Sequence, residues 1–454
     1  MTDHVSSKKW KRPNRFATYA SRLRLHITDS GLILTLSFMT GLLSGICAFL
    51  LKYLIATISG LLTRGLAPDS FNLSFIIMPV IGIVITALFC RYAIKDNVAN
   101  GVNKLMADIN NKKYRLKSNT IYGSIIASAF TLGFGGSAGS EGPIAYAGAG
   151  IGSRIGQTFK IPHNMMPALI GCGAAAGIAG IFKSPIGGAL FTLEILRIRL
   201  NTVTVMGIFI ATVTSALTAY ILSGYSMDIH AGSLGHFDPS TIIWLFPLGV
   251  ICGLYSLYYT WTGSLAKRKL CSCRNSSLKY IASGAALGLM IFVLPSLFGE
   301  GYSTITDIID KDTCTLTRYS IFENIGIDHR LLILILCSGI LLLKGIGSSV
   351  TNNGGGVAGD FAPTLFAGCV LGLMFSSVIN DSGIATLDTS HFALTAMAGA
   401  MAGIIRAPLM AMFIVTEMVG GFDFLLPVAI VSLVSYGIVM IFKHDTFYHS
   451  HTFK

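Results

Sequence analysis

Long stretches without charge are the feature that most limits what this chain can fold into. A helix needs about 20 mainly apolar residues to cross the roughly 30 Å hydrocarbon core of a bilayer. Six charge-free runs of the 454-residue chain are long enough: 31–51, 120–140, 202–227, 241–266, 280–299 and 424–442. Only 12% of the residues are charged, against about 25% in a typical soluble domain. The sequence therefore predicts an all-α membrane protein with many transmembrane helices.

Other apolar runs indicate that several of these helices are tilted or broken. The runs 75–90, 331–343 and 407–416 are too short for an upright crossing, and 50 glycines interrupt many of the rest. Broken membrane helices are typical of transporters and channels, where the interrupted backbone lines the substrate site.

The distribution of basic residues predicts the topology. The first 30 residues carry seven basic side chains and two acidic ones, and the segment 266–279 carries five basic side chains and no acidic one. Positively charged segments remain in the cytoplasm, so we expect a cytoplasmic N-terminus in a multi-pass protein of the cell inner membrane. No cleavable signal peptide is evident. The net charge of +12 is thus explained by topology, and no nucleic-acid module accompanies it.

Two signatures recur along the chain. The first has the form GxxxPxxxxGxxxG and occurs as GSEGPIAYAGAGIG at 139–152 and as GDFAPTLFAGCVLG at 359–372, with an offset of 220 residues. In the second, a GxxxG-like GAAAG at 173–177 precedes Pro185, and GAMAG at 399–403 precedes Pro408. In both copies of the second signature a basic residue stands two before the proline and a glutamate nine after it: Lys183 and Glu194, then Arg406 and Glu417.

This order predicts two homologous halves. We place the first half at 31–227 and the second at 228–443, between a basic N-terminal segment, 1–30, and a short tail, 444–454. If an odd number of crossings separates the copies, the halves are inverted, and equivalent loops meet near the middle of the membrane.

Each copy of the first signature can build an anion site. A glycine-rich stretch followed by proline is typical of a helix start, here directed into the membrane. The free N–H groups and the positive dipole end of such a terminus attract an anion without a full positive charge. Two such termini facing each other would form a pore for a small anion. The alternative is that the loops only allow helices to pack closely.

Carboxylates near these loops are the candidate functional side chains. Glu141 lies inside the first loop, where an ionisable group is costly unless it is paired or functional. When ionised it can occupy the place of the anion, and when protonated it can leave, so it can serve as gate and proton carrier; alternatively it caps its helix. We expect Asp360, in the second loop, to be a helix cap. The symmetry of Glu194 and Glu417 favours a structural role for both.

These motifs resemble the CLC family of chloride channels and chloride/proton antiporters over essentially the whole chain. The family's G(K/R)EGP motif appears as GSEGP at 139–143, its GxFxP motif as GDFAP at 359–363, and its late tyrosine as Tyr448. Its earliest motif, GSGIP, falls on 99–103 with Asn100 at the serine position. The resemblance implies a CLC-like inverted-repeat bundle in which Glu141 is the gating residue. It places these residues at the anion: Asn100, Gly101, Ser140, Gly142, Asp360, Phe361, Ala362 and Tyr448.

Three departures from the family pattern bear on mechanism. Ser140 replaces the usual basic residue beside the gate, and Asn100 replaces the central serine. The family's inner proton-relay glutamate would directly follow Glu194, but Ile195 stands there, and isoleucine cannot carry a proton. Glu194 is therefore a possible inner proton path.

The function predicted from these residues is transport of chloride or a similar small anion by chloride/proton antiport, with the ions as substrates and no cofactor or metal. A passive anion channel, or an antiporter for fluoride or nitrate, is the alternative. The resemblance further implies a homodimer with one pore per subunit, and no CBS domains, because the chain ends six residues after Tyr448. An intramembrane hydrolase is a distant alternative: HExxH and GxSxG are absent, and His444, His449 and His451 lie in a polar tail.

Overall fold

A computed structural model describes residues 29–64, 73–95, 101–199, 201–227, 229, 237–312, 316 and 328–442. Within these residues the chain is helical, and the only β-type pairing is one isolated bridge. Eight helices of the described part are long and apolar enough to cross a membrane. The chain is therefore a multi-pass membrane protein, as its apolar runs predict.

The helices of the described residues divide between the two predicted halves. The described part of the first half contains α2 (Asp29–Thr63), α3 (Ser74–Phe89), α4 (Gly101–Asn110), α5 (Asn119–Gly133), α6 (Glu141–Thr158), α7 (Met166–Phe182), α8 (Pro185–Phe191) and α9 (Thr202–Leu222). The second contains α10 (Leu245–Cys271), α11 (Ser276–Val293), α12 (Tyr302–Ile309), α14 (His329–Asn353), α15 (Phe361–Asp381), α16 (Thr389–Ile405), α17 (Pro408–Val419) and α18 (Leu425–Phe442).

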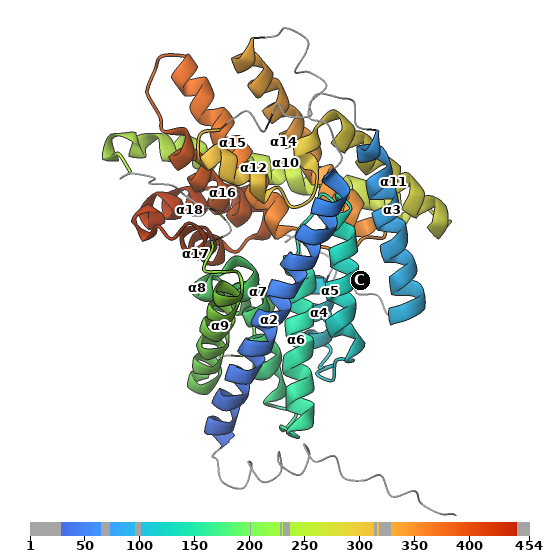
Figure 1. Cartoon of the computed structure of the whole chain (residues 1–454). Coiled ribbons are helices and arrows are strands. Elements are labelled where there is room, and N and C mark those ends of the chain that lie inside the picture. Colours follow the sequence, from blue (N-terminus) through green and yellow to red (C-terminus); the bar gives the residue numbers. More distant parts are fainter. Residues whose placement is uncertain are drawn as a thin grey trace, which may run out of the picture.

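The packing between helices repeats in the two halves, as the sequence signatures do. Helix α2 packs against α7 and α9, and its counterpart α10 packs against α16 and α18. Likewise α6 packs along α7, and α15 packs along α16. In Figure 1 most helices of the first half, blue to green, lie below those of the second half, yellow to red, and α7 and α8 approach α16 and α17 between them. The boundary between the halves at 227/228, and their inversion, stay predictions.

The glycines inside the first signature let these helix pairs approach closely. A Cβ atom built at Gly148 on α6 would lie 2.1 Å from the carbonyl oxygen of Gly173 on α7. In the second half, a Cβ atom at Gly368 on α15 would lie 2.4 Å from the carbonyl oxygen of Ala396 on α16. Both distances are far below van der Waals contact, so only glycine fits. For these helical glycines, the close-packing interpretation applies.

The basic residue of the second signature ends a helix in each half. Lys183 ends α7 with φ of 54°, and Arg406 ends α16 with φ of 60°. A left-handed residue terminates a helix, and the proline two positions later begins the next one, α8 or α17. The shared spacing of base and proline therefore encodes a sharp break between two helices.

Three predicted runs have different lengths in the structure. The run 120–140 is not one span, because α5 ends at Gly133 and Gly135 turns the chain with φ of 94°. The run 75–90 belongs to a longer helical segment, Ser74–Ile94, of 21 residues. The run 331–343 belongs to the 25-residue α14, which continues through the buried Lys344. Helix α17, with 12 residues, is short as predicted.

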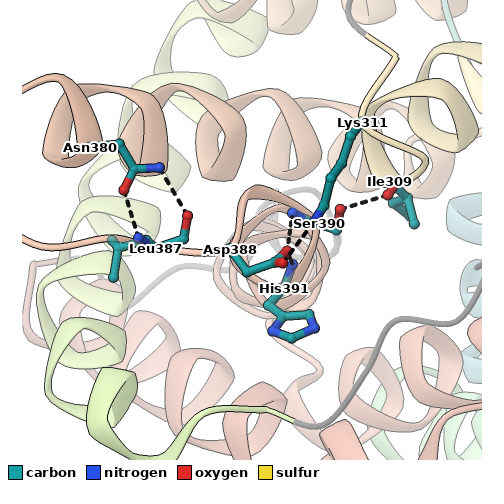
Figure 2. A network of polar contacts seen from close by, with 7 residues as sticks. All are labelled: Ile309, Lys311, Asn380, Leu387, Asp388, Ser390 and His391. Carbon is teal, nitrogen blue, oxygen red and sulfur yellow. Dashed lines mark hydrogen bonds and ion pairs between the residues drawn. The ribbon is translucent and has the colours of Figure 1, made fainter.

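A polar network at the edge of the apolar core joins the ends of α12, α15 and α16 (Figure 2). Asp388 accepts hydrogen bonds from the backbone amides of Ser390 and His391 at 3.0 and 3.3 Å, and its Oδ2 lies 2.8 Å from Lys311 Nζ. Ser390 Oγ donates to the carbonyl of Ile309 at 2.6 Å. The side chain of Asn380 bonds both backbone groups of Leu387. This network fixes where α16 begins.

Candidate functional site

The two glycine-rich loops meet directly, although 220 residues separate them. The amide of Gly139 donates to the carbonyl of Gly359 at 2.9 Å, and the amide of Gly359 donates to the carbonyl of Gly139 at 2.5 Å. This antiparallel bridge joins the residues just before α6 and α15. A Cβ atom at Gly359 would lie 2.7 Å from the amide nitrogen of Gly142, so the contact depends on glycine. The repeated signature therefore brings two helix starts together.

A third helix begins at the same place. Gly101, the first residue of α4, lies so close to α6 that a Cβ atom there would be 2.5 Å from the carbonyl oxygen of Gly142. The N-termini of α4, α6 and α15 thus converge. Because the first amides of a helix have no partner within the helix and carry partial positive charge, converging N-termini favour an anion between them.

Glu141 places a carboxylate at this convergence. Its side chain is fully buried, and its Oε1 accepts a hydrogen bond of 2.5 Å from the amide of Ala362 in the first turn of α15. The other oxygen, Oε2, is buried without a hydrogen-bond partner among the described residues. A carboxylate of the first half therefore accepts a hydrogen bond from an amide at a helix start of the second half.

The residues that follow Gly359 have distinct environments. Phe361 is buried, with its ring 6.1 Å from that of Phe191, at the end of α8. Asp360 does not cap α15, so that prediction is wrong. Its Oδ1 accepts instead from Ser348 Oγ at 2.6 Å and from Asn352 Nδ2 at 2.9 Å. These two donors lie one turn apart on α14 and hold the Asp360 side chain against that helix.

Two charged residues that the sequence did not single out flank the site. Glu300 Oε1 accepts from both the amide and the hydroxyl of Ser140, at 2.9 and 2.6 Å. Lys344 is fully buried, donates to Ser137 Oγ at 2.9 Å, and has its Nζ 4.6 Å from the centre of the Phe366 ring. Lys344 had a sequence signal, since a single charge inside an apolar helix commonly marks a functional site.

The paired glutamates of the second signature cap helices of the opposite half. Glu194 accepts from the amides of Leu409 and Met410 at 3.1 and 2.7 Å, at the N-terminus of α17. Glu417 accepts from the amides of Ile186 and Gly187, each within 3.1 Å, and from the hydroxyl of Ser184, at the N-terminus of α8. The geometry supports the structural role that their symmetry favours. Ile195, next to Glu194, is buried with 4% of its surface exposed.

Several predicted residues lie outside the described part of the chain. Asn100 and Tyr448, predicted to contact the anion, are among them, as are His444, His449 and His451. Their predicted roles stay predictions.

Fold and site together define a class of protein: a multi-pass membrane protein whose broken helices direct their N-termini, and one buried carboxylate, at a common point. Comparison with known proteins identifies the family within that class. The family model for the voltage gated chloride channel matches residues 82–440. The chain therefore belongs to the voltage gated chloride channel family.

Individual relatives are more distant. A ClcB-like chloride channel protein of Ralstonia nicotianae is 25% identical over 375 residues, which cover 80% of this chain and 81% of that protein. The H(+)/Cl(-) exchange transporter ClcA of Vibrio cholerae serotype O1 is 26% identical over 315 residues, covering 66% of this chain and 62% of the relative. The crystal structure of a slow cyanobacterial Cl-/H+ antiporter superposes with a TM-score of 0.75 at 18% identity, covering 92% of this chain and 96% of that one.

Proposed function

We propose that this protein exchanges chloride for protons across the membrane, with Glu141 as gate and proton carrier. The observation that carries the proposal is the hydrogen bond from the amide of Ala362 to the fully buried carboxylate of Glu141. Relatives named as an H(+)/Cl(-) exchange transporter and a Cl-/H+ antiporter support it. The substrates are the two ions, and the chemistry requires no cofactor.

The mechanism follows from competition for one set of donors. Ionised Glu141 is a tethered anion that satisfies the amide of Ala362 and excludes chloride. Protonation removes its charge, so the carboxyl group loses its advantage at the positive helix end and chloride can take its place. Backbone amides carry only partial charge, so chloride binds and still leaves quickly. Because the same group must gain a proton before an anion enters, the two fluxes are coupled.

The remaining anion contacts are assigned on proximity and family resemblance. Gly101, Ser140 and Gly142 lie at the starts of α4 and α6, while Phe361 and Ala362 lie at the start of α15. We further infer an inverted arrangement of the halves, a homodimer with one pore per subunit, and an inner-membrane location with a cytoplasmic N-terminus. The inverted arrangement agrees with the antiparallel pairing of Gly139 and Gly359.

A passive channel is the second candidate, and Ile195 is the observation that favours it. This buried isoleucine stands where the family's inner proton-relay glutamate would be, so protons reaching Glu141 from that side need another path.

Flux in proteoliposomes distinguishes the two candidates. With the purified full chain, an outward chloride gradient should drive proton movement against a proton gradient, while a channel would move chloride alone. Replacing Glu141→Gln should abolish proton movement and preserve chloride flux, and Asp381→Asn, a control at the exposed end of α15, should retain both. Loss of both fluxes in Glu141→Gln would contradict the gate assignment. Repeating the efflux with fluoride and nitrate tests the choice of anion.

A further inference from the structure

Glu300 stands on a turn that directs it at the anion site. It lies between the short 3₁₀ turn Pro295–Leu297 and the start of α12. The glycines on either side, Gly299 and Gly301, have φ of 70° and 88°, which other residues rarely adopt. A Cβ atom at Gly301 would also lie 2.6 Å from the Phe366 ring. This sharp turn presents the partly exposed carboxylate of Glu300 to the buried Ser140.

The contact with Ser140 parallels the contact of Glu141. Glu141 holds the amide of Ala362 at the start of α15, and Glu300 holds the amide and the hydroxyl of Ser140 at the start of α6. Each carboxylate comes from another segment of the chain and satisfies a donor at a converging helix N-terminus. A donor satisfied by a carboxylate is not available to a mobile anion.

Charged groups surround Glu300, so its own charge affects how an anion approaches Ser140. Glu300 is bonded to Ser140, the neighbour of Glu141, and the buried Lys344 of α14 donates to Ser137, three residues before Ser140. Asp360 directly follows Gly359, the partner of Gly139 in the bridge. On the other side, Lys52 of α2 lies 5.0 Å from the ring of Tyr302, two residues beyond Glu300. Three carboxylates thus surround the site with one fully buried lysine among them. An ionised Glu300 adds negative charge at the place where an anion must approach.

We propose that Glu300 is a second tethered carboxylate that competes with the transported anion for the amide and hydroxyl of Ser140. This inference rests on the proposed function. Where the family pattern has a basic residue that would attract anions, this chain has Ser140 bonded to a carboxylate, so anion access is restrained until Glu300 is protonated or displaced. Acidification should therefore accelerate anion flux through Glu300 even when Glu141 cannot titrate.

The test uses a Glu141→Gln background, in which the gate carries no proton. Chloride efflux from proteoliposomes is measured between about pH 3.5 and 8, so that the range includes the ordinary pKa of a glutamate, about 4.3. In Glu141→Gln alone, flux should rise as the pH falls. Adding Glu300→Gln, which keeps an acceptor oxygen for Ser140, should raise flux at neutral pH by about tenfold, a change expected from removing a charge near an ion path, and should flatten the pH dependence. The surface control Asp381→Asn, in the same background, should change neither quantity.

A structural role for Glu300 predicts the opposite. If the carboxylate only anchors the turn to α6, Glu300→Gln and Glu300→Ala will slow the flux or leave it unchanged, and the pH dependence will persist; either result overturns the inference. Chloride binding to the detergent-solubilised protein, measured by calorimetry, separates this failure from failure of the proposed function. If the wild-type protein binds and transports chloride and the Glu300 variants bind chloride with equal affinity, only the role of Glu300 is rejected. Absence of chloride binding and flux in wild type, Glu141→Gln and Glu300→Gln alike rejects both.

Discussion

Replacing Glu194→Gln separates a helix cap from a proton path at the residue beside Ile195. Both carboxylate oxygens of Glu194 accept backbone amides, from Leu409 at 3.1 Å and from Met410 at 2.7 Å. Glutamine has the same shape but only one acceptor oxygen. Its side-chain nitrogen would face one of these amides, donor against donor, so one hydrogen bond is lost and the other loses its charge.

The expected cost follows from the number of donors and their burial. Hydrogen bonds to a charged group contribute about 1.5–3 kcal/mol each, but Glu194 is partly exposed and water can replace a lost bond. We therefore expect Glu194→Gln to lower the free energy of unfolding by about 1–2 kcal/mol. Glu417 is the matched comparison, since it is 8% exposed and also accepts from the hydroxyl of Ser184. Glu417→Gln should cost about 2–4 kcal/mol.

Both quantities can be measured on the same preparations. Denaturant titration of the full chain in mixed micelles gives the free energy of unfolding, and proteoliposome flux gives the number of protons moved per chloride. A capping role predicts reduced stability with an unchanged proton-to-chloride ratio in both variants. A lower ratio in Glu194→Gln with wild-type stability would refute the capping argument and identify Glu194 as a proton carrier.

Two further predictions concern packing and pH. Gly148→Ala should lower the free energy of unfolding by about 1–3 kcal/mol, because its Cβ atom would overlap the carbonyl of the facing helix. The control Gly60→Ala has open space around it and should not destabilise the protein. Equal effects of the two substitutions in denaturant titration would contradict the close-packing argument. Partial burial acts to raise the pKa of Asp388, but the hydrogen bond from Lys311 and the charge of His391 outweigh it and hold that pKa below its usual value. A lowered pKa in the folded state means that Asp388 stabilises the fold above about pH 3.9, the unfolded value, and that this contribution is lost as the pH falls below it. Lys311→Gln should therefore reduce stability at neutral pH, by no more than about 1 kcal/mol for so exposed a pair, and make the loss of stability at acidic pH less steep. If stability falls with acidic pH as it does in the wild-type protein, the pair contributes nothing.

The meeting of the two loops could be predicted because glycine, proline and spacing all have local physical meaning. GSEGP and GDFAP each indicate a helix start, and their repetition indicates that two such starts lie together. The contact between Gly139 and Gly359 confirms this. For Glu194, helix geometry excludes the N-terminus of its own helix as the group that it caps. Pro185, at that N-terminus, lies nine residues earlier, or about 13 Å along a helix, which is beyond the reach of a glutamate side chain. Which other terminus it reaches was not visible in the sequence.

Long-range side-chain contacts account for what the sequence could not show. The bond from Ser140 to Glu300 joins residues 160 positions apart, and no periodicity connects them. An aspartate before a helix is typically a cap, but the side chain of Asp360 accepts hydrogen bonds from Ser348 and Asn352 of the preceding helix instead. In the sequence Lys344 directly follows an apolar run, and only the structure shows it as a charge inside α14.

Because Glu194 and Glu417 each cap a helix of the opposite half, these caps form in a fixed order during synthesis of the chain. When the ribosome has completed the first half, the amides that begin α8 have no acceptor, because Glu417 has not yet been made. Glu194 is already present by then but must wait for α17. The nascent chain therefore enters the bilayer with its central junction open, and this junction closes only when nearly the whole polypeptide has been inserted. A truncated product that stops before residue 417 leaves the amides of Ile186 and Gly187 without this acceptor.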